Sequence, residues 1–131
     1  MPLQKIENYC NAVSRLSEAL AAYTKNPDDV IRDGVIQRFE FTFELAWKSL
    51  REYLADQGAD MNGIVFSKQV FKAAYAARII DDEQTWIAML NSRNITSHVY
   101  DDKEATKVAA DIRDRYIGPL AALAEFYQNN A

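Results

Sequence analysis

A single cysteine occurs in this chain of 131 residues, so no disulfide bond can form within it. That residue, Cys10, falls on the apolar stripe of a predicted helix, where a small buried hydrophobic role is commoner than a reactive thiol. Histidine is equally scarce, because His98 is the only one. Chemistry that needs two imidazoles therefore needs a second copy of the chain.

Long apolar runs are also absent. No stretch approaches the roughly 20 apolar residues that cross a bilayer, and Met1–Glu7 lacks the continuous apolar core of a signal peptide. No internal repeat or low-complexity segment interrupts the chain. These absences predict a cytoplasmic protein with no membrane partner, built as a single domain over residues 1–131.

The chain has little excess charge, since 15 basic and 19 acidic residues leave a formal net charge of −4. This acidity argues against a protein that holds nucleic acid mainly by bulk electrostatics, and we expect no DNA partner. A transient contact between an enzyme and RNA needs only a few local cations. The charge therefore weakens a binding-module hypothesis more than a nuclease hypothesis.

The apolar residues recur at steps of three and four, which is the period of amphipathic helices. One such stripe predicts a first helix that buries Leu3, Ile6, Cys10, Val13, Leu16, Leu20 and Tyr23. Another predicts a long helix over Val35–Leu54 that buries Ile36, Phe39, Phe43, Trp47, Leu50 and Leu54. We expect an all-α fold, an up-and-down bundle of four to five helices.

A polar face of Glu40, Glu44 and Lys48 lies beside the apolar stripe of the long helix. A pair of helix-spaced charges is the simplest explanation, since Glu44 and Lys48 stand in the favourable order for an ion pair. The alternative is an active-site role, in which Glu40 would be a supporting residue. We expect no metal and no cofactor, because the Glu-x-x-His pairs that hold metals in helical bundles are missing.

Residues that cap helices mark where the first elements start. The segment Asn26–Asp29 offers an N-cap, a proline whose missing N–H is harmless, and acids in the first turn of the second helix. After a surface connection, Ser67 can cap a short third helix. Phe66 would then pack against Phe71 as a hydrophobic staple.

Two further capping boxes predict the later helices. Asp81 with Gln84 would start the fourth helix, and Asp101 with Glu104 would start the last one. The Gly118-Pro119 pair disturbs a helix, yet the apolar period continues beyond it. We therefore expect a bend in the last helix, not a domain boundary.

The ten residues Asn91–Tyr100 hold the only histidine together with an arginine, asparagines and a tyrosine. Histidine exchanges protons near neutral pH, and the planar guanidinium of arginine suits a phosphate that gains charge in a transition state. Arg93 and His98 are thus candidate catalytic residues for phosphodiester cleavage. Five residues of ideal helix would rotate their side chains about 140° apart, so we expect the helix to loosen between them.

A purely structural explanation of these residues is the alternative. His98 would then be satisfied by a backbone carbonyl at a helix end. Arg93 would pair with an acid such as Asp101 or Asp102, and Tyr100 would pack its ring while its hydroxyl reaches water.

Arg93, Asn94, His98 and Tyr100 resemble the hallmark of the HEPN proteins: arginine, a polar residue, three more residues, histidine, any residue, tyrosine. The segment Gln37–Lys48 is similar to the second-helix signature of the HepT-type members, which are encoded beside a minimal nucleotidyltransferase. This resemblance covers most of the chain. It implies a four- to five-helix bundle, a homodimer and, in many members, a metal-independent ribonuclease toxin controlled by its nucleotidyltransferase partner.

The resemblance also implies roles for single residues. Arg93 and His98 would be catalytic, with Asn94 and Glu40 in support. Cleavage of RNA without a metal needs a base, an acid and positive charge, which two copies of the motif at a two-fold axis would supply. The expected products are a 2′,3′-cyclic phosphate and a 5′-hydroxyl.

In the family that this chain resembles, the nucleotidyltransferase transfers AMP from ATP to the tyrosine of the motif, here Tyr100. Each AMP would bring bulk and negative charge that oppose an RNA phosphate. The chain would then be the toxin, and the nucleotidyltransferase the antitoxin, of a two-gene system. The alternatives are a noncatalytic subunit that binds or regulates a nucleotidyltransferase, and a purely structural bundle.

Overall fold

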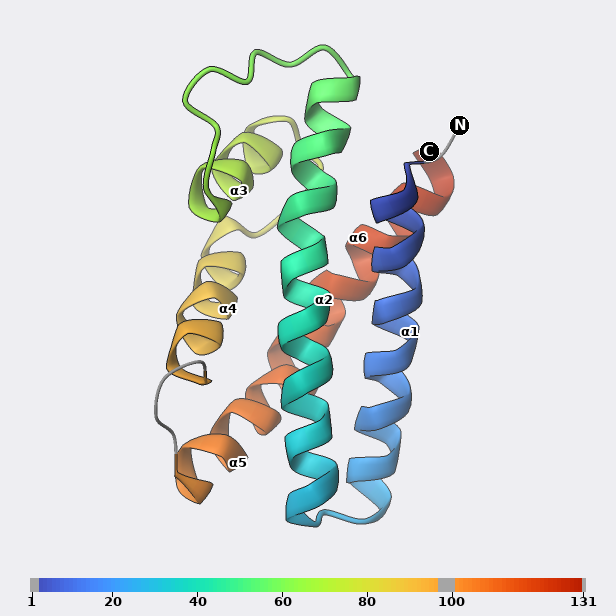
Figure 1. Ribbon diagram of the computed structural model, residues 1–131, viewed down its shortest axis with the longest axis vertical. Helices are drawn as coiled ribbons and strands as arrows, with labels where there is room; N and C mark the ends of the chain where they lie inside the picture. The colour runs from blue at the N-terminus through green and yellow to red at the C-terminus, as the bar shows by residue number, and fades with distance from the viewer. Residues whose placement is uncertain (1–2, 97–100, 131) are drawn as a thin grey trace.

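The computed structural model describes residues 3–96 and 101–130, and no strand occurs among them (Figure 1). The first four helices are α1 (Gln4–Lys25), α2 (Asp29–Asp56), α3 (Ser67–Ala76) and α4 (Glu83–Thr96). The last helical path runs through α5 (Asp102–Asp111), a π-helical segment (Ile112–Tyr116) and α6 (Ile117–Asn130) without a break. The predicted all-α bundle of four to five helices is confirmed.

α2 is the central helix of the bundle (Figure 1). It runs antiparallel to α1 and also packs against α3, α4 and α5. α6 returns to the start of α1, where the Tyr9 hydroxyl donates to the Leu120 carbonyl at 2.6 Å. The beginning and the end of the described chain therefore lie close together. No helix in the described ranges is both long and apolar enough to span a membrane.

The helical period predicted most of the core correctly. The expected residues of α1 and α2 are buried, except that Leu3, Cys10 and Trp47 are only partly covered. Aromatic rings connect the helices: Phe39 of α2 stacks on Tyr116 of the π-helical segment, with ring centroids 5.5 Å apart. Burial raises the pKa of Tyr9, so its hydroxyl stays protonated and remains a hydrogen-bond donor.

The predicted cap of α5 is confirmed, whereas the caps of α2 and α4 differ from prediction. The Asp101 carboxylate accepts from the Glu104 N–H at 2.8 Å. α2 is capped by Asp28, two residues later than the predicted N-cap, and Pro27 lies outside the helix. α4 is preceded by Asp82, and not by Asp81 as predicted, because Asp82 can bond both the backbone and the hydroxyl of Thr85.

The start of α3 also differs from the prediction. The Gln69 side-chain carbonyl accepts from the backbone N–H groups of Val65 and Phe66, each at 2.9 Å. This contact makes Phe66 the N-cap residue and places Ser67 inside the helix. Phe66 is 71% exposed while Phe71 is fully buried, so the predicted hydrophobic staple is wrong.

Where the sequence predicted a bend near Gly118-Pro119, the structure has the π-helical segment Ile112–Tyr116. In a regular α-helix the ring of Pro119 would clash with the carbonyl of Arg115, four residues earlier. The wider π-helical turn ends next to this point, where the Ile117 N–H bonds to the Ile112 carbonyl. The helical path continues beyond it and buries Leu120, Leu123 and Tyr127, as the period predicted.

Two phenylalanines at the start of α3 provide a matched test of this packing. Phe71→Ala should lower the free energy of unfolding by about 3–5 kcal/mol, because it leaves a cavity in the core. Phe66→Ala should change it by less than about 0.5 kcal/mol, because the ring faces solvent. Urea denaturation of both variants measures the difference. Equal losses would contradict the exposed position of Phe66.

Candidate functional site

The candidate motif begins in the last turn of α4. Arg93 is half-buried and Asn94 is exposed, and the helix is unbroken through Thr96. The predicted loosening between Arg93 and His98 therefore does not begin before Thr96. His98 and Tyr100 lie outside the described residues, so their roles stay predictions.

Glu40 of α2 is in contact with this last turn. The Thr96 hydroxyl lies 3.0 Å from the Glu40 carboxylate and 3.0 Å from the backbone carbonyl of Arg93. Thr96 is buried and Glu40 is half-buried. The structure thus brings together two of the candidate residues, Arg93 and Glu40, around one hydroxyl group.

Glu44 has a different environment, although the sequence placed it on the same polar face as Glu40. Its carboxylate lies 3.6 Å from the ammonium group of Lys48, and both side chains are partly exposed. The simple ion-pair explanation is correct for this pair. In the described part of the chain, Glu40 forms a hydrogen bond with the end of α4 and Glu44 does not.

The residue before Arg93 fixes α4 to the π-helical segment. Ser92 is buried, and its hydroxyl lies 2.7 Å from the hydroxyl of Tyr116. The Tyr116 hydroxyl also lies 3.3 Å from the Ala88 carbonyl, one turn earlier on α4. The sequence predicted that Tyr116 is buried. The sequence did not identify a hydrogen-bond partner for the Tyr116 hydroxyl, although a buried phenol usually has one.

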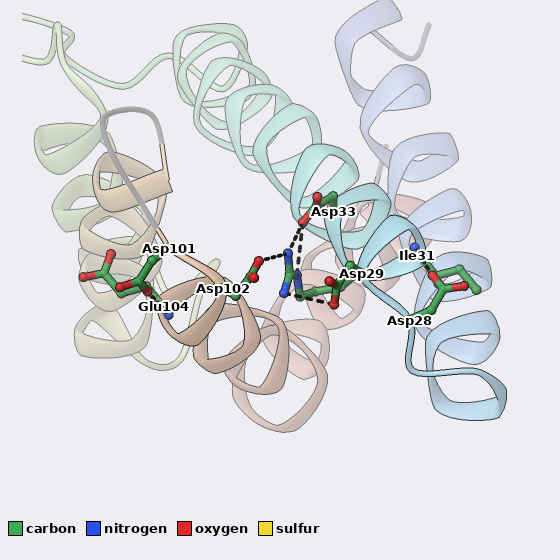
Figure 2. Close-up of polar contacts among 8 residues, drawn as sticks. Asp28, Asp29, Ile31, Asp33, Asp101, Asp102 and Glu104 are labelled. Carbon is green, nitrogen blue, oxygen red and sulfur yellow. Dashed lines mark hydrogen bonds and ion pairs between the residues drawn. The ribbon is translucent and has the colours of Figure 1, made fainter.

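Arg32, near the start of α2, is the main residue that the sequence analysis missed. It is 5% exposed, and Asp29, Asp33 and Asp102 surround its guanidinium (Figure 2). A cation near a helix N-terminus is unfavourable, and the carboxylates offset this cost. The acids next to Arg32 in the sequence could have indicated an ion-paired arginine, but Asp102 lies 70 positions further along the chain. Its pairing could not be deduced from sequence spacing.

The proposed structural partners of Arg93 are engaged elsewhere. Asp101 caps α5 through the Glu104 N–H, and Asp102 forms an ion pair with Arg32 at 3.0 Å. Within residues 3–96 and 101–130, Arg93 forms no ion pair with a carboxylate. The suggested pairing of Arg93 with Asp101 or Asp102 is therefore wrong. A half-buried guanidinium in this situation can bind an anion such as a phosphate.

A separate cavity of about 500 Å³ lies between the α3–α4 connection and α6. It is lined by Arg78, Trp86, Pro119 and Phe126 among others, and by no described residue of the motif. In the described part of the chain, no group of three or more histidine, cysteine, aspartate or glutamate side chains is arranged to hold a metal ion. Arg93 and Glu40 thus lie outside the lining of this cavity.

Comparison with known proteins gives matches over most of the chain. The family described as nucleotidyltransferase substrate binding protein like matches residues 4–129. A Haemophilus influenzae protein named probable ribonuclease HepT is 34% identical over 104 residues, which cover 78% of this chain and 71% of that protein.

Two solved structures share the fold. One, from Haemophilus influenzae, is described as revealing the fold of a substrate binding domain of a nucleotidyltransferase. It has a TM-score of 0.83 and 27% identity, and the match covers 94% of this chain and 98% of that one. A Thermus thermophilus protein has a TM-score of 0.70 and 27% identity, with 91% and 94% covered.

Proposed function

Since this chain belongs to the nucleotidyltransferase substrate binding protein like family, we propose that it is a HepT-type ribonuclease controlled by a nucleotidyltransferase partner. The observation that carries the proposal is the position of Arg93, which is half-buried in the last turn of α4, where the Thr96 hydroxyl contacts both the Arg93 carbonyl and Glu40. The 34% identity to a probable ribonuclease HepT supports the same activity. The chain would be the toxin of a two-gene system, and its partner the antitoxin.

The chemistry follows from the residue types of the motif. His98 removes the proton of a ribose 2′-hydroxyl, and the resulting oxygen attacks the adjacent phosphorus. The bond to the 5′-oxygen breaks, and that oxygen takes a proton from the histidine of a second copy. Arg93 stabilises the charge that develops on the phosphate. The products are a 2′,3′-cyclic phosphate and a 5′-hydroxyl, and the reaction needs no metal.

Glu40 and Asn94 support this site in the proposal. Glu40 contacts Thr96, which also lies 3.0 Å from the Arg93 carbonyl, so its carboxylate helps to hold the last turn of α4. Asn94 follows Arg93 directly and is exposed in the same turn.

Substitutions in the motif should remove the nuclease activity. Arg93→Ala and His98→Ala should each lower the RNA cleavage rate by about 100-fold or more. Arg93→Lys should also fail, because a point charge does not replace a planar guanidinium. Gel assays with purified protein measure the rates, and the exposed Arg51→Ala provides a matched control. Activity lost with EDTA and restored by magnesium would contradict the metal-independent mechanism.

A homodimer should be the active species, because the sequence has one histidine and the mechanism uses two. Light scattering at micromolar concentration should give twice the mass of the 14.9 kDa chain. His98→Ala should leave this mass unchanged, which separates assembly from catalysis. A monomer that still cleaves RNA would refute the composite site.

Tyr100 should accept AMP from the partner nucleotidyltransferase and ATP. The added negative charge should oppose binding of RNA and silence cleavage. Peptide mass spectrometry maps the adduct, and a cleavage assay follows its effect. Tyr100→Phe should escape silencing, whereas the exposed Tyr75→Phe should behave as wild type. Complete silencing of Tyr100→Phe by the partner would show that control does not act through this hydroxyl.

The second candidate is a noncatalytic subunit that binds or regulates a nucleotidyltransferase. It is favoured by the solved relative that is described as a substrate binding domain of such an enzyme. In that case His98→Ala would leave the function unchanged, because the protein would act through an apolar face that binds a second copy or the partner. A neighbouring gene with a Gly-Ser and paired-Asp nucleotidyltransferase motif is expected under both candidates, so the cleavage assay distinguishes them.

A further inference from the structure

The two described flanks of the motif are both attached to α2. On the N-terminal side, Thr96 contacts Glu40 at 3.0 Å. On the C-terminal side, Asp102 contacts Arg32 at 3.0 Å. Arg32 and Glu40 are eight residues apart on α2, which is about 12 Å along the helix axis. One rigid helix thus holds the chain on both sides of residues 97–101.

The contact of Arg32 differs from an ordinary surface ion pair. Its side chain is 5% exposed, so its charge is largely removed from water and depends on the surrounding carboxylates. Asp33 at 3.0 Å and Asp29 at 3.4 Å lie on the same helix as Arg32 and offset its charge. Of these three acids, only Asp102 belongs to a different helix.

Asp102 is the first residue of α5, so the ion pair acts on the start of that helix. Directly before it, the Asp101 carboxylate accepts from the Glu104 N–H, and the Asp101 carbonyl accepts from the Ala105 N–H at 2.9 Å. Figure 2 shows this cap beside the acids that surround Arg32. A shift of Asp102 would therefore move the cap and the first turn of α5 together.

We propose that Arg32 is a positioning residue for the candidate active site, acting through its ion pair with Asp102. Asp102 follows Tyr100 by two residues and His98 by four. The ion pair fixes the end of the chain segment that leaves the motif, while Glu40 fixes the end that enters it. Its effect on cleavage rests on the proposed ribonuclease function, because small misplacements of catalytic groups lower the rate of a reaction steeply.

Two single substitutions separate this role from general stability. Asp102→Asn removes the carboxylate that reaches α5, and the residue is 84% exposed, so the variant should fold. Asp33→Asn weakens two contacts to the same guanidinium, at 3.0 and 3.1 Å, without touching α5. Thermal unfolding should show that Asp33→Asn loses at least as much stability as Asp102→Asn. Asp33→Asn is therefore the matched control.

Hydrogen exchange of the first turn of α5 tests the contact without reference to activity. The amides of Glu104 and Ala105 should exchange about ten-fold faster in Asp102→Asn than in Asp33→Asn, because the start of α5 has lost its attachment to α2. Unchanged exchange in Asp102→Asn would overturn the proposal.

Cleavage kinetics test the positioning role. Asp102→Asn should lower kcat about ten-fold or more with little change in KM, whereas Asp33→Asn should keep kcat within about two-fold of wild type. Arg32→Lys should also lower kcat, because an ammonium group lacks the planar geometry that spans several carboxylates. Equal kcat values for Asp102→Asn and Asp33→Asn would overturn the positioning role.

The two measurements distinguish failure of this inference from failure of the proposed function. If the wild-type chain cleaves no RNA, the ribonuclease proposal fails, and the exchange rates still decide whether Arg32 holds the start of α5. If the wild type cleaves RNA and both variants match it, the ribonuclease proposal stands and the positioning role of Arg32 fails.

Discussion

Burial of α2 on several sides is the constraint on which the rest of the bundle depends. Its apolar residues pack against α1, α3, α4 and α5, so one helix sets the positions of the others. Arg32 and Glu40 of the same helix make polar contacts where α5 begins and where α4 ends. The central helix therefore also holds the two helix ends that flank the candidate motif.

Buried hydroxyl groups add directional contacts to an otherwise apolar core. Ser92 pairs with Tyr116, Ser49 pairs with Tyr127, and Tyr9 donates to a carbonyl of α6. In the described part of the chain, no buried side-chain nitrogen or oxygen lacks a hydrogen-bond partner. Apolar packing alone permits small shifts between helices, whereas a satisfied hydroxyl pair selects one arrangement. The position of the turn that carries Arg93 follows in part from the pair next to it.

The sequence predicted the elements whose signals are local. The period of three and four located α1 and α2 and most of their buried residues, and Asp101 was identified as a cap from its spacing to Glu104. Caps were misplaced where neighbouring acids compete, since Asp81 and Asp82 are equally suitable by residue type. Asp82 is favoured over Asp81 because its carboxylate also accepts a hydrogen bond from the Thr85 hydroxyl.

Contacts between distant segments could not be predicted from the spacing of residues in the sequence. Glu40 and Glu44 look alike in the sequence, yet Glu44 bonds within its helix and Glu40 bonds 56 positions away. Arg32 was not singled out in the sequence, because its partner Asp102 lies in another helix. The motif itself was recognised by resemblance, and the structure describes its arginine and asparagine but not His98 or Tyr100.

The π-helical segment Ile112–Tyr116 has a consequence for how the chain tolerates insertions and deletions. A π-helical turn contains about one residue more than an α-helical turn, so it takes up one extra residue without rotating the helix that follows. The same residue added to a regular α-helix would rotate all of α6 by about 100° relative to α5. Leu120, Leu123 and Tyr127 would then turn away from the core that they now fill. The wide turn therefore keeps the angular register of the C-terminal helix.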